Sequence, residues 1–90
     1  MLQVVWTVKF KKEYKLCMKR GKKMDLLDDV IRMLAAQQPL PAKYRDHVLS
    51  NNWEGFRECH IEPDWLLIYG VSNERLILTL VRTGSHSDLF

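Results

Sequence analysis

Residues 53–90 read WEGFRECHIEPDWLLIYGVSNERLILTLVRTGSHSDLF, and this stretch decides the fold. It contains three runs of strand length, at about residues 54–60, 64–70 and 75–82, that are rich in aliphatic, aromatic and β-branched residues. Turn-forming residues from Gly70 to Asn73 separate the second run from the third. The second run is apolar on both faces, which is typical of a strand in the middle of a sheet. We therefore expect an antiparallel meander of three strands.

The first half of the chain predicts one more strand and two helices. Residues 3–10 (QVVWTVKF) are β-branched and aromatic, as in a strand. Residues 11–20 have core-facing side chains at helical spacing. A second helix is expected to begin with Asp25 as its N-cap and to end before Pro39. The sequence predicts an α+β fold in which residues 1–90 form one domain, with the helices as a hairpin on one face of the sheet.

The composition limits the functional classes. Hydrophobic residues make up 47% of the chain, as in a globular domain. No apolar run approaches the roughly 20 residues that a membrane span needs, and the N-terminus lacks a secretory signal pattern. Cys17 and Cys59 form no CxxC motif, which favours a reduced cytoplasmic protein. Cys59 and His60 point to opposite faces of a strand and no third ligand has suitable spacing, so we expect no metal site and no cofactor.

The net charge of +3 is unevenly distributed. Residues 1–23 hold eight Lys or Arg and one acid, a net charge of +7, whereas residues 24–90 carry −4. Lysines at every fourth position predict a basic stripe along the first helix. Such a surface suits a phosphate backbone, although a solvated helix face has the same pattern. The candidate residues for binding such a backbone are Lys11, Lys15, Lys19, Lys22 and Lys23.

Two polar clusters flank the apolar runs. The first contains His60 and Asp64, and the second contains Arg82 and His86. In an antiparallel meander the end of the first strand lies near the start of the second, whereas the position of the third strand's end depends on strand order. His47 lies in a segment that we expect to be a loop or short turn. Arg82, at the end of an apolar ladder, fits a strand-end ion pair as well as a functional role.

The chain resembles the YafQ-type branch of the RelE/ParE superfamily, the toxins of type II toxin–antitoxin modules. The resemblance covers about half of the chain and is carried by the blocks Tyr44-Arg-Asp-His47, Trp53-Glu-Gly-Phe-Arg57, His60-Ile-Glu-Pro-Asp64-Trp65, Leu67-Ile-Tyr69, Arg82-Thr-Gly-Ser-His86 and Leu89-Phe90. It implies a compact RelE-like fold, ribosome-dependent cleavage of mRNA and inhibition by a bound antitoxin. The family's active residues match His47, His60, Asp64, Trp65, Arg82, His86 and Phe90, and the block that ends in Tyr69 adds a further substrate contact.

These residue types suit RNA cleavage without a metal ion. The RNA's own 2′-OH can attack the adjacent phosphate if a base accepts its proton and an acid protonates the leaving 5′-oxygen. Histidine titrates near neutral pH, so His86 and His60 are the expected proton-transfer pair, with His47 assisting. Arg82 offers a fork of donors to phosphate oxygens, and Asp64 can orient a histidine or act as base. Among the aromatic residues, Trp65 and Phe90 are expected to stack on a base.

Two other functional classes remain open. One is a non-catalytic toxin of the same fold that binds a protein target, and the other is a basic nucleic-acid-binding module. Three histidines at motif positions argue against the first, and the second leaves the His/Asp/Arg set unexplained. The expected partners are a cognate antitoxin in a tight complex, with a heterotetramer as one candidate assembly, and the ribosome with its mRNA. Operator DNA would be contacted only through the antitoxin, and we expect no membrane partner.

Overall fold

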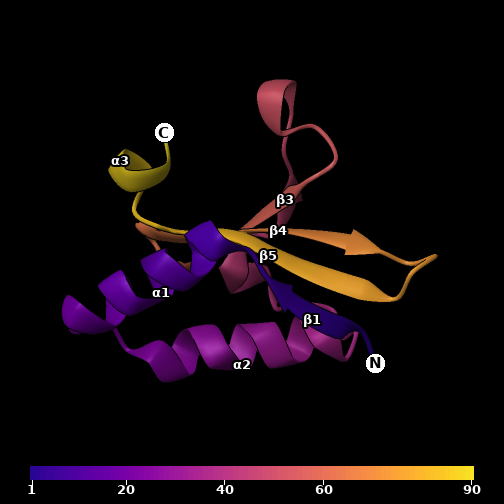
Figure 1. Cartoon of the computed structure of the whole chain (residues 1–90), viewed down its shortest axis with the longest axis horizontal. Helices are drawn as coiled ribbons and strands as arrows, with labels where there is room; N and C mark the ends of the chain where they lie inside the picture. Colours follow the sequence, from indigo (N-terminus) through magenta and orange to yellow (C-terminus); the bar gives the residue numbers. More distant parts are fainter.

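The computed structural model describes residues 1–90 and shows a five-stranded sheet with three α-helices (Figure 1). The strand order is β1-β5-β4-β3-β2, with β1 parallel to β5 and the other neighbours antiparallel. No helix combines the length and the apolar character needed to cross a bilayer. The elements are β1 (Gln3–Trp6), α1 (Val8–Lys19), α2 (Met24–Ala35), the 3-10 turn η1 (Ala42–Tyr44), β2 (His47–Val48), the 3-10 turn η2 (Asn51–Trp53), β3 (Arg57–Glu62), β4 (Trp65–Ser72), β5 (Ile77–Gly84) and α3 (His86–Leu89).

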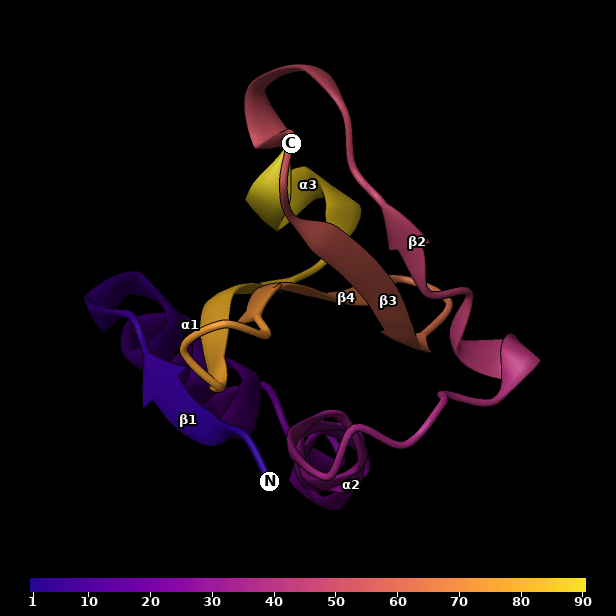
Figure 2. The ribbon, with the colours of Figure 1, turned by 90° about the vertical axis from the view of Figure 1, so that its right-hand side faces the viewer.

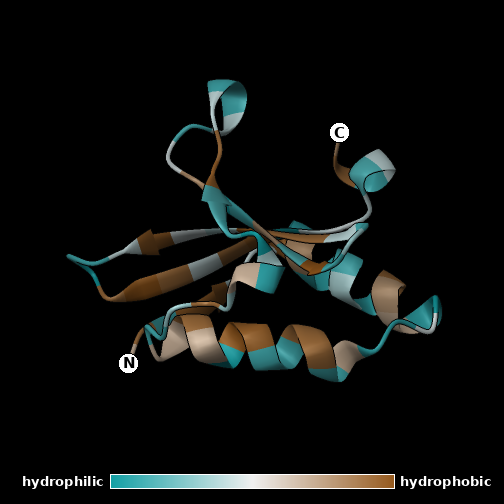
Figure 3. Ribbon diagram, turned by 180° about the vertical axis from the view of Figure 1, so that it is seen from behind, coloured by the Kyte–Doolittle hydropathy of each residue, from teal (hydrophilic) through white to brown (hydrophobic).

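The sheet separates two cores, one on each face. The α1–α2 hairpin covers one face, and the short helix α3 lies on the other (Figures 1 and 2). The larger core joins Phe10 of α1 and Leu27 of α2 to alternate residues of β4 and β5. The smaller core places Leu89 of α3 against Leu66 and Ile68. In Figure 3 hydrophobic residues form bands on β4, β5 and α2, whereas the loops are mostly hydrophilic. The predicted α+β fold, with a helical hairpin on one face, is confirmed.

The meander predicted for the second half is confirmed, and its central strand is β4. Residues Trp65 to Tyr69 are all buried, because β4 is covered by α1 and α2 on one side and by α3 on the other. The prediction for the first strand is wrong beyond Trp6. Thr7 caps α1, since its Oγ1 accepts a hydrogen bond from the N–H of Phe10 at 3.0 Å. A capped helix start therefore replaces the end of the expected strand.

Two further boundaries differ from the prediction. Asp25 is not the N-cap of α2: the helix begins at Met24, and Asp25 lies in its first turn, where an acid favours the helix dipole. The second predicted strand was expected near residue 54, but β3 begins at Arg57 because residues 51–53 form a 3-10 turn. The segment around His47, expected to be a loop, contains the two-residue edge strand β2.

The strand order brings three strand ends together. The pairing of β4 with β5 places Leu66 opposite Gly84, and the pairing of β3 with β4 places His60 opposite Leu66. The end of β3, the start of β4 and the end of β5 therefore lie side by side, and α3 begins directly after β5. Gly84 is required here, because a Cβ at this position would lie 2.9 Å from the Asp88 side chain.

Candidate active site

Three histidines converge at this edge of the sheet. His47 comes from the edge strand β2, His60 from β3, and His86 is the first residue of α3. The ring centroids of His47 and His60 are 6.2 Å apart, and those of His60 and His86 are 5.8 Å apart. The structure therefore brings together all three histidines of the chain, as the sequence predicted for a site.

The Nδ1 atom of each histidine ring lies within hydrogen-bonding distance of an oxygen atom. His47 Nδ1 lies 2.7 Å from the carbonyl oxygen of Arg45, and His60 Nδ1 lies 3.2 Å from that of Pro63. His86 Nδ1 lies 2.7 Å from a carboxylate oxygen of Asp64. Carbonyl and carboxylate oxygens only accept hydrogen bonds, so each Nδ1 carries the proton. None of the three Nε2 atoms forms a hydrogen bond within the protein, and those of His47 and His60 lie near the carboxylate of Glu58.

Asp64 aligns His86 through two hydrogen bonds. One carboxylate oxygen accepts from the backbone N–H of His86 at 3.0 Å and from its Nδ1 at 2.7 Å. These bonds lower the pKa of the Asp64 carboxyl, so it remains ionised near neutral pH. The backbone bond fixes the start of α3, and the ring bond fixes the orientation of the imidazole. This arrangement agrees with the orienting role expected for Asp64.

Glu58 is a member of the cluster that the sequence analysis missed. It lies opposite His47 in the β2–β3 ladder, and its side chain is only 7% exposed. Its Oε1 is 3.4 Å from His47 Nε2 and 3.8 Å from His60 Nε2. The alternation of β3 places residues 58 and 60 on one face, and this was the available signal. What the sequence did not show was that β2 pairs with this edge.

The cluster can hold a cation. Ligand atoms of His47, Glu58 and His60 all lie within 4.8 Å of one another. Both imidazoles donate their Nδ1–H to a backbone carbonyl, which is the usual support for a metal-ligating histidine. The expectation that no third ligand has suitable spacing was wrong, since strand pairing and not chain spacing brings the ligands together. Cys59 is not a ligand: its thiol is buried on the opposite face, and burial raises its pKa.

Arg82 forms a strand-end ion pair. Its Nε and Nη2 donate to the carboxylate of Glu13 on α1, at 2.9 and 2.8 Å. Nη2 also donates to the carbonyl oxygen of Asp88 in α3. Both side chains of the pair are 14% exposed, and the bonds to Glu13 raise the pKa of Arg82. No hydrogen bond joins Arg82 to the histidines, so this conformation leaves only Nη1 without a partner in the protein.

Two predicted substrate contacts are structural instead. Trp65 is fully buried, and its Nε1–H donates to the Thr83 hydroxyl at 3.0 Å. Tyr69 is 1% exposed. Its hydroxyl donates to Asp46, and burial raises its pKa. Neither ring has a face on which a base could stack, so both interpretations were wrong. Since Asp46 precedes His47, Tyr69 acts at a distance by anchoring the segment that carries this histidine.

Phe90 has the exposure that stacking requires. Its side chain is 62% exposed and lies edge-on to Trp53, with the ring centroids 6.5 Å apart. Trp53 in turn contacts Phe56. These rings form an aromatic surface beside α3, in line with the stacking expected for Phe90.

Lys22 differs from the other candidate lysines in its surroundings. Lys11, Lys15, Lys19 and Lys23 are exposed, as a basic stripe requires. Lys22 is half-buried, and its Nζ lies 5.7 Å from the centroid of the Trp65 ring. Its charge contributes to the lowered pKa of Asp64. The position is set by the end of α1, where Lys22 N–H bonds Cys17 O after Gly21 with φ +76°.

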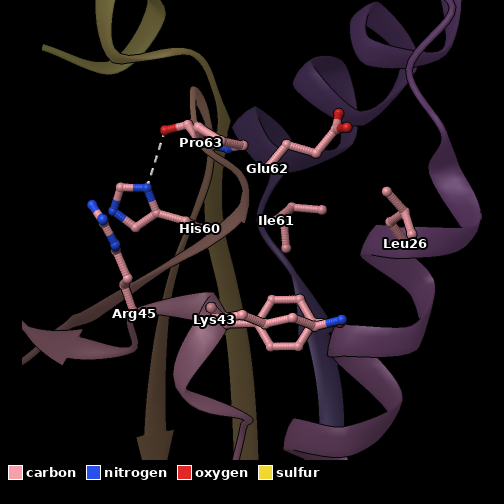
Figure 4. Close-up of a pocket in the computed structure, with 8 residues that line it drawn as sticks. Leu26, Lys43, Arg45, His60, Ile61, Glu62 and Pro63 are labelled. Atoms are coloured by element: carbon pink, nitrogen blue, oxygen red, sulfur yellow. Dashed lines mark hydrogen bonds between the residues drawn. The ribbon is translucent and has the colours of Figure 1, made fainter.

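A pocket of about 470 Å³ opens beside His60 (Figure 4). One side is formed by His60 and Arg45, and Leu26 of α2 lies opposite. Ile61 and Tyr44 provide apolar surface between them. The pocket therefore shares one wall with the histidine cluster, although no residue of the pocket other than His60 was predicted as a site residue.

This sheet, its helical hairpin and the cluster of three histidines with Asp64 and Glu58 define a small α+β toxin domain of the RelE/ParE type. The family model described as "Bacterial toxin of type II toxin-antitoxin system, YafQ" matches residues 2–90. The chain belongs to this YafQ family, and the resemblance found in the sequence is confirmed.

Similar proteins support the assignment. The chain is 41% identical over 88 residues to the mRNA interferase toxin YafQ of Escherichia coli strain B / BL21-DE3, covering 97% of this chain and 94% of the relative. A metal-bound toxin from Helicobacter pylori is similar in structure, with a TM-score of 0.94, 46% identity and full coverage of both chains. The E. coli DinJ–YafQ complex matches with a TM-score of 0.90 and 40% identity, covering 100% of this chain and 99% of that one.

Proposed function

We propose that this chain is an mRNA interferase, the toxin of a type II toxin–antitoxin module, and that it cleaves mRNA on the ribosome. The observation that carries the proposal is the set of three imidazoles whose Nδ1 atoms are held by oxygens while their Nε2 atoms form no hydrogen bond within the protein. The relatives named mRNA interferase toxin YafQ support the same activity. The cytoplasm, where ribosomes and mRNA are found, is the corresponding location.

The reaction uses the RNA's 2′-OH as the nucleophile. One histidine accepts the 2′-OH proton while the oxygen forms a bond to the adjacent phosphorus. A second histidine gives a proton to the 5′-oxygen as its bond to phosphorus breaks. The products are a 2′,3′-cyclic phosphate and a 5′-OH. The ring centroids of His60 and His86 are 5.8 Å apart, close enough for both side chains to reach one phosphate, which supports these two as the proton-transfer pair, with His47 assisting.

The charge that develops on the phosphate needs cationic donors. Arg82 supplies them through Nη1, the nitrogen that Glu13 leaves free. Asp64 holds His86 in the required orientation. Phe90 stacks on a base and so positions the strand. Trp65 and Tyr69 have no substrate contact in this proposal.

A metal-assisted variant is the second candidate, because His47, Glu58 and His60 provide three ligand atoms. A divalent cation there would supply a Lewis acid for the phosphate oxygens. Cleavage by metal-depleted toxin supports the metal-independent reaction. Loss of cleavage after depletion, with recovery on adding Zn²⁺ or Mn²⁺, supports the variant.

The partners follow from the same assignment. The DinJ–YafQ complexes support a cognate antitoxin that binds this chain tightly. Ribosome and mRNA are the target, and operator DNA is reached only through the antitoxin. If the chain instead arrests growth while mRNA on its ribosomes stays intact, a non-catalytic toxin with a protein target is the better description.

A substrate with one 2′-deoxy nucleotide tests the proposal. Translating ribosomes carry an mRNA with the deoxy sugar directly 5′ of the scissile phosphate, and single-turnover cleavage is followed. We expect no cut at this bond, whereas a deoxy sugar placed several nucleotides away leaves cleavage unchanged. His86→Ala and His60→Ala should each slow cleavage by on the order of 10²–10⁴. Undiminished cleavage of the deoxy bond would show that water, and not the 2′-OH, is the nucleophile.

A further inference from the structure

We propose that the pocket between α2, η1 and β3 is a nucleotide subsite that takes the base next to the scissile phosphate. The inference rests on the proposed function, since it names where that reaction reads its substrate. The pocket measures about 470 Å³, within the range of roughly 300–1,000 Å³ found for small-ligand sites. It opens at His60, so a nucleotide bound there is adjacent to the phosphate on which the histidines act.

His60 connects the pocket to the histidine cluster. Its ring lines the pocket (Figure 4), while its Nε2 lies 3.8 Å from Glu58 in the cluster. The bond from Nδ1 to Pro63 O fixes the ring between the two. A polynucleotide with its phosphate at the histidines therefore places the neighbouring base at the mouth of the pocket.

The pocket has the mixed character that a base requires. Its interior is apolar where Ile61, Leu26 and the Tyr44 ring lie, and Glu62 adds a carboxylate that can accept hydrogen bonds from a base edge. Flat apolar surface favours stacking, and a few polar groups give selectivity. A sequence preference of cleavage would arise here.

Two positively charged side chains that form no salt bridge line the pocket. Arg20, Arg32, Arg57 and Arg82 all form salt bridges with acids, whereas Arg45 forms none. Lys43 is also unpaired with any acid, and its Nζ lies 5.1 Å from the centroid of the Tyr44 ring. Figure 4 shows Arg45 beside the His60 ring, and Lys43 lines the same pocket. These charges are available for the phosphates of the bound nucleotide.

Arg45 is also placed by its backbone. Its φ of 50° and ψ of 41° lie in the left-handed region, which is uncommon for a residue other than glycine. This conformation directs its carbonyl oxygen to His47 Nδ1 and its side chain to the pocket. One residue therefore belongs to both the histidine cluster and the proposed subsite.

A pocket-filling variant tests the proposal. Leu26→Trp places a large ring in the pocket without changing a histidine. Met33→Trp is the matched control, because Met33 lies on the same helix and lines a second hollow that shares only Tyr44 with the pocket. Single-turnover cleavage on ribosomes is measured with a normal mRNA and with mRNAs that lack one base on either side of the scissile phosphate.

With wild-type toxin, removal of one particular base should slow cleavage by about tenfold or more, as for a lost stacking contact. Leu26→Trp should show a similar loss on normal mRNA and no additional loss when that base is absent, whereas Met33→Trp should behave as wild type. Full activity of Leu26→Trp overturns the proposal. A Leu26→Trp variant that is slow but still sensitive to the missing base also overturns it. The same holds if this variant loses only antitoxin binding.

A second pair of variants does not depend on how α2 accommodates tryptophan. Arg45→Gln should raise the KM for ribosome-bound mRNA several-fold and make it less sensitive to salt. Arg75→Gln, which removes another unpaired arginine at the β4–β5 turn, should have no effect. Equal behaviour of the two variants contradicts the subsite. Wild-type toxin that fails to cut any mRNA would instead reject the proposed function.

Discussion

The guanidinium of Arg82 and the carboxylate of Glu13 form a bidentate pair between β5 and α1, with the two shortest distances at 2.8 and 2.9 Å. Both side chains are largely buried. The same guanidinium bonds the carbonyl oxygen of Asp88, so the pair connects α1, the central sheet and the helix that carries His86. A residue expected to bind phosphate is therefore also a structural link.

Glu13→Gln separates these two roles of Arg82. It removes the charge partner, leaves a largely buried cation unpaired, and should lower the free energy of unfolding by about 3 kcal/mol. Catalysis by the folded fraction should be retained, because Nη1, the proposed phosphate donor, does not depend on a bond to Glu13. Arg82→Ala should lose both stability and activity. Urea unfolding and single-turnover cleavage measure the two effects, and equal loss of activity in both variants would contradict a phosphate role.

Lys22 should affect the rate of cleavage, in contrast to the lysines of the exposed stripe. Lys22→Ala removes a positive charge beside Asp64 and should slow cleavage by saturated complexes about tenfold, which corresponds to roughly 1.4 kcal/mol. Lys23→Ala is the control: it should leave this rate unchanged. If both variants cleave at the same rate at saturation, Lys22 has the same role as the exposed lysines of the stripe.

The stripe of Lys11, Lys15, Lys19 and Lys23 should serve association with the ribosome. Replacing three of these lysines by Gln should weaken binding and reduce its salt dependence. The rate at saturation should stay nearly constant, since these side chains are exposed and lie far in sequence from the histidines. Binding measured at several salt concentrations checks this, and a loss of rate with unchanged binding would refute it.

Phe90 should be needed as an aromatic ring. Phe90→Ala removes the exposed ring beside Trp53 and should lower activity, whereas Phe90→Trp should keep much of it if stacking is the role. A short C-terminal extension should also lower activity by displacing the ring. Cleavage assays on the three variants give the answer, and full activity of Phe90→Ala would remove this residue from the site.

Stability should fall in acid through Asp88. Bonds from Arg20 and from the Ser85 N–H lower the pKa of Asp88 to about 2, below its unfolded value of about 3.9. The stabilisation is therefore present above pH 4 and is lost as the pH falls towards 2. It amounts to about 1 kcal/mol after solvent screening is allowed for.

Asp88→Asn tests this pH dependence. The free energy of unfolding of wild type, measured by urea at pH 7 and pH 3, should fall more than that of the variant. Asp29→Asn, which removes the partner of Arg32 on the exposed face of α2, is the control and should retain the wild-type difference. An unchanged difference in Asp88→Asn would show that another carboxyl controls it.

The sequence by itself determined the fold class and the histidines of the site. Alternating apolar residues specify strands through local geometry. The helical spacing of apolar residues that includes Phe10 in the first helix and Leu27 in the second specifies the buried face of each helix. The family blocks identified His47, His60 and His86. Boundaries were less certain, because a single side chain decides them: Thr7 ends the first strand by capping α1.

Only the tertiary structure decided which of the candidate residues lie together at the exposed edge of the sheet and which are buried. Trp65 and Tyr69 belong to sequence blocks that match the toxin family, yet the central position of β4 in the sheet buries both side chains. Glu58 joins the site because β2 pairs with β3, a contact that a two-residue edge strand hardly signals in sequence. Arg82 is held by Glu13, 69 residues away in the chain. Burial and ion pairing depend on contacts between distant segments, and local sequence patterns do not contain them.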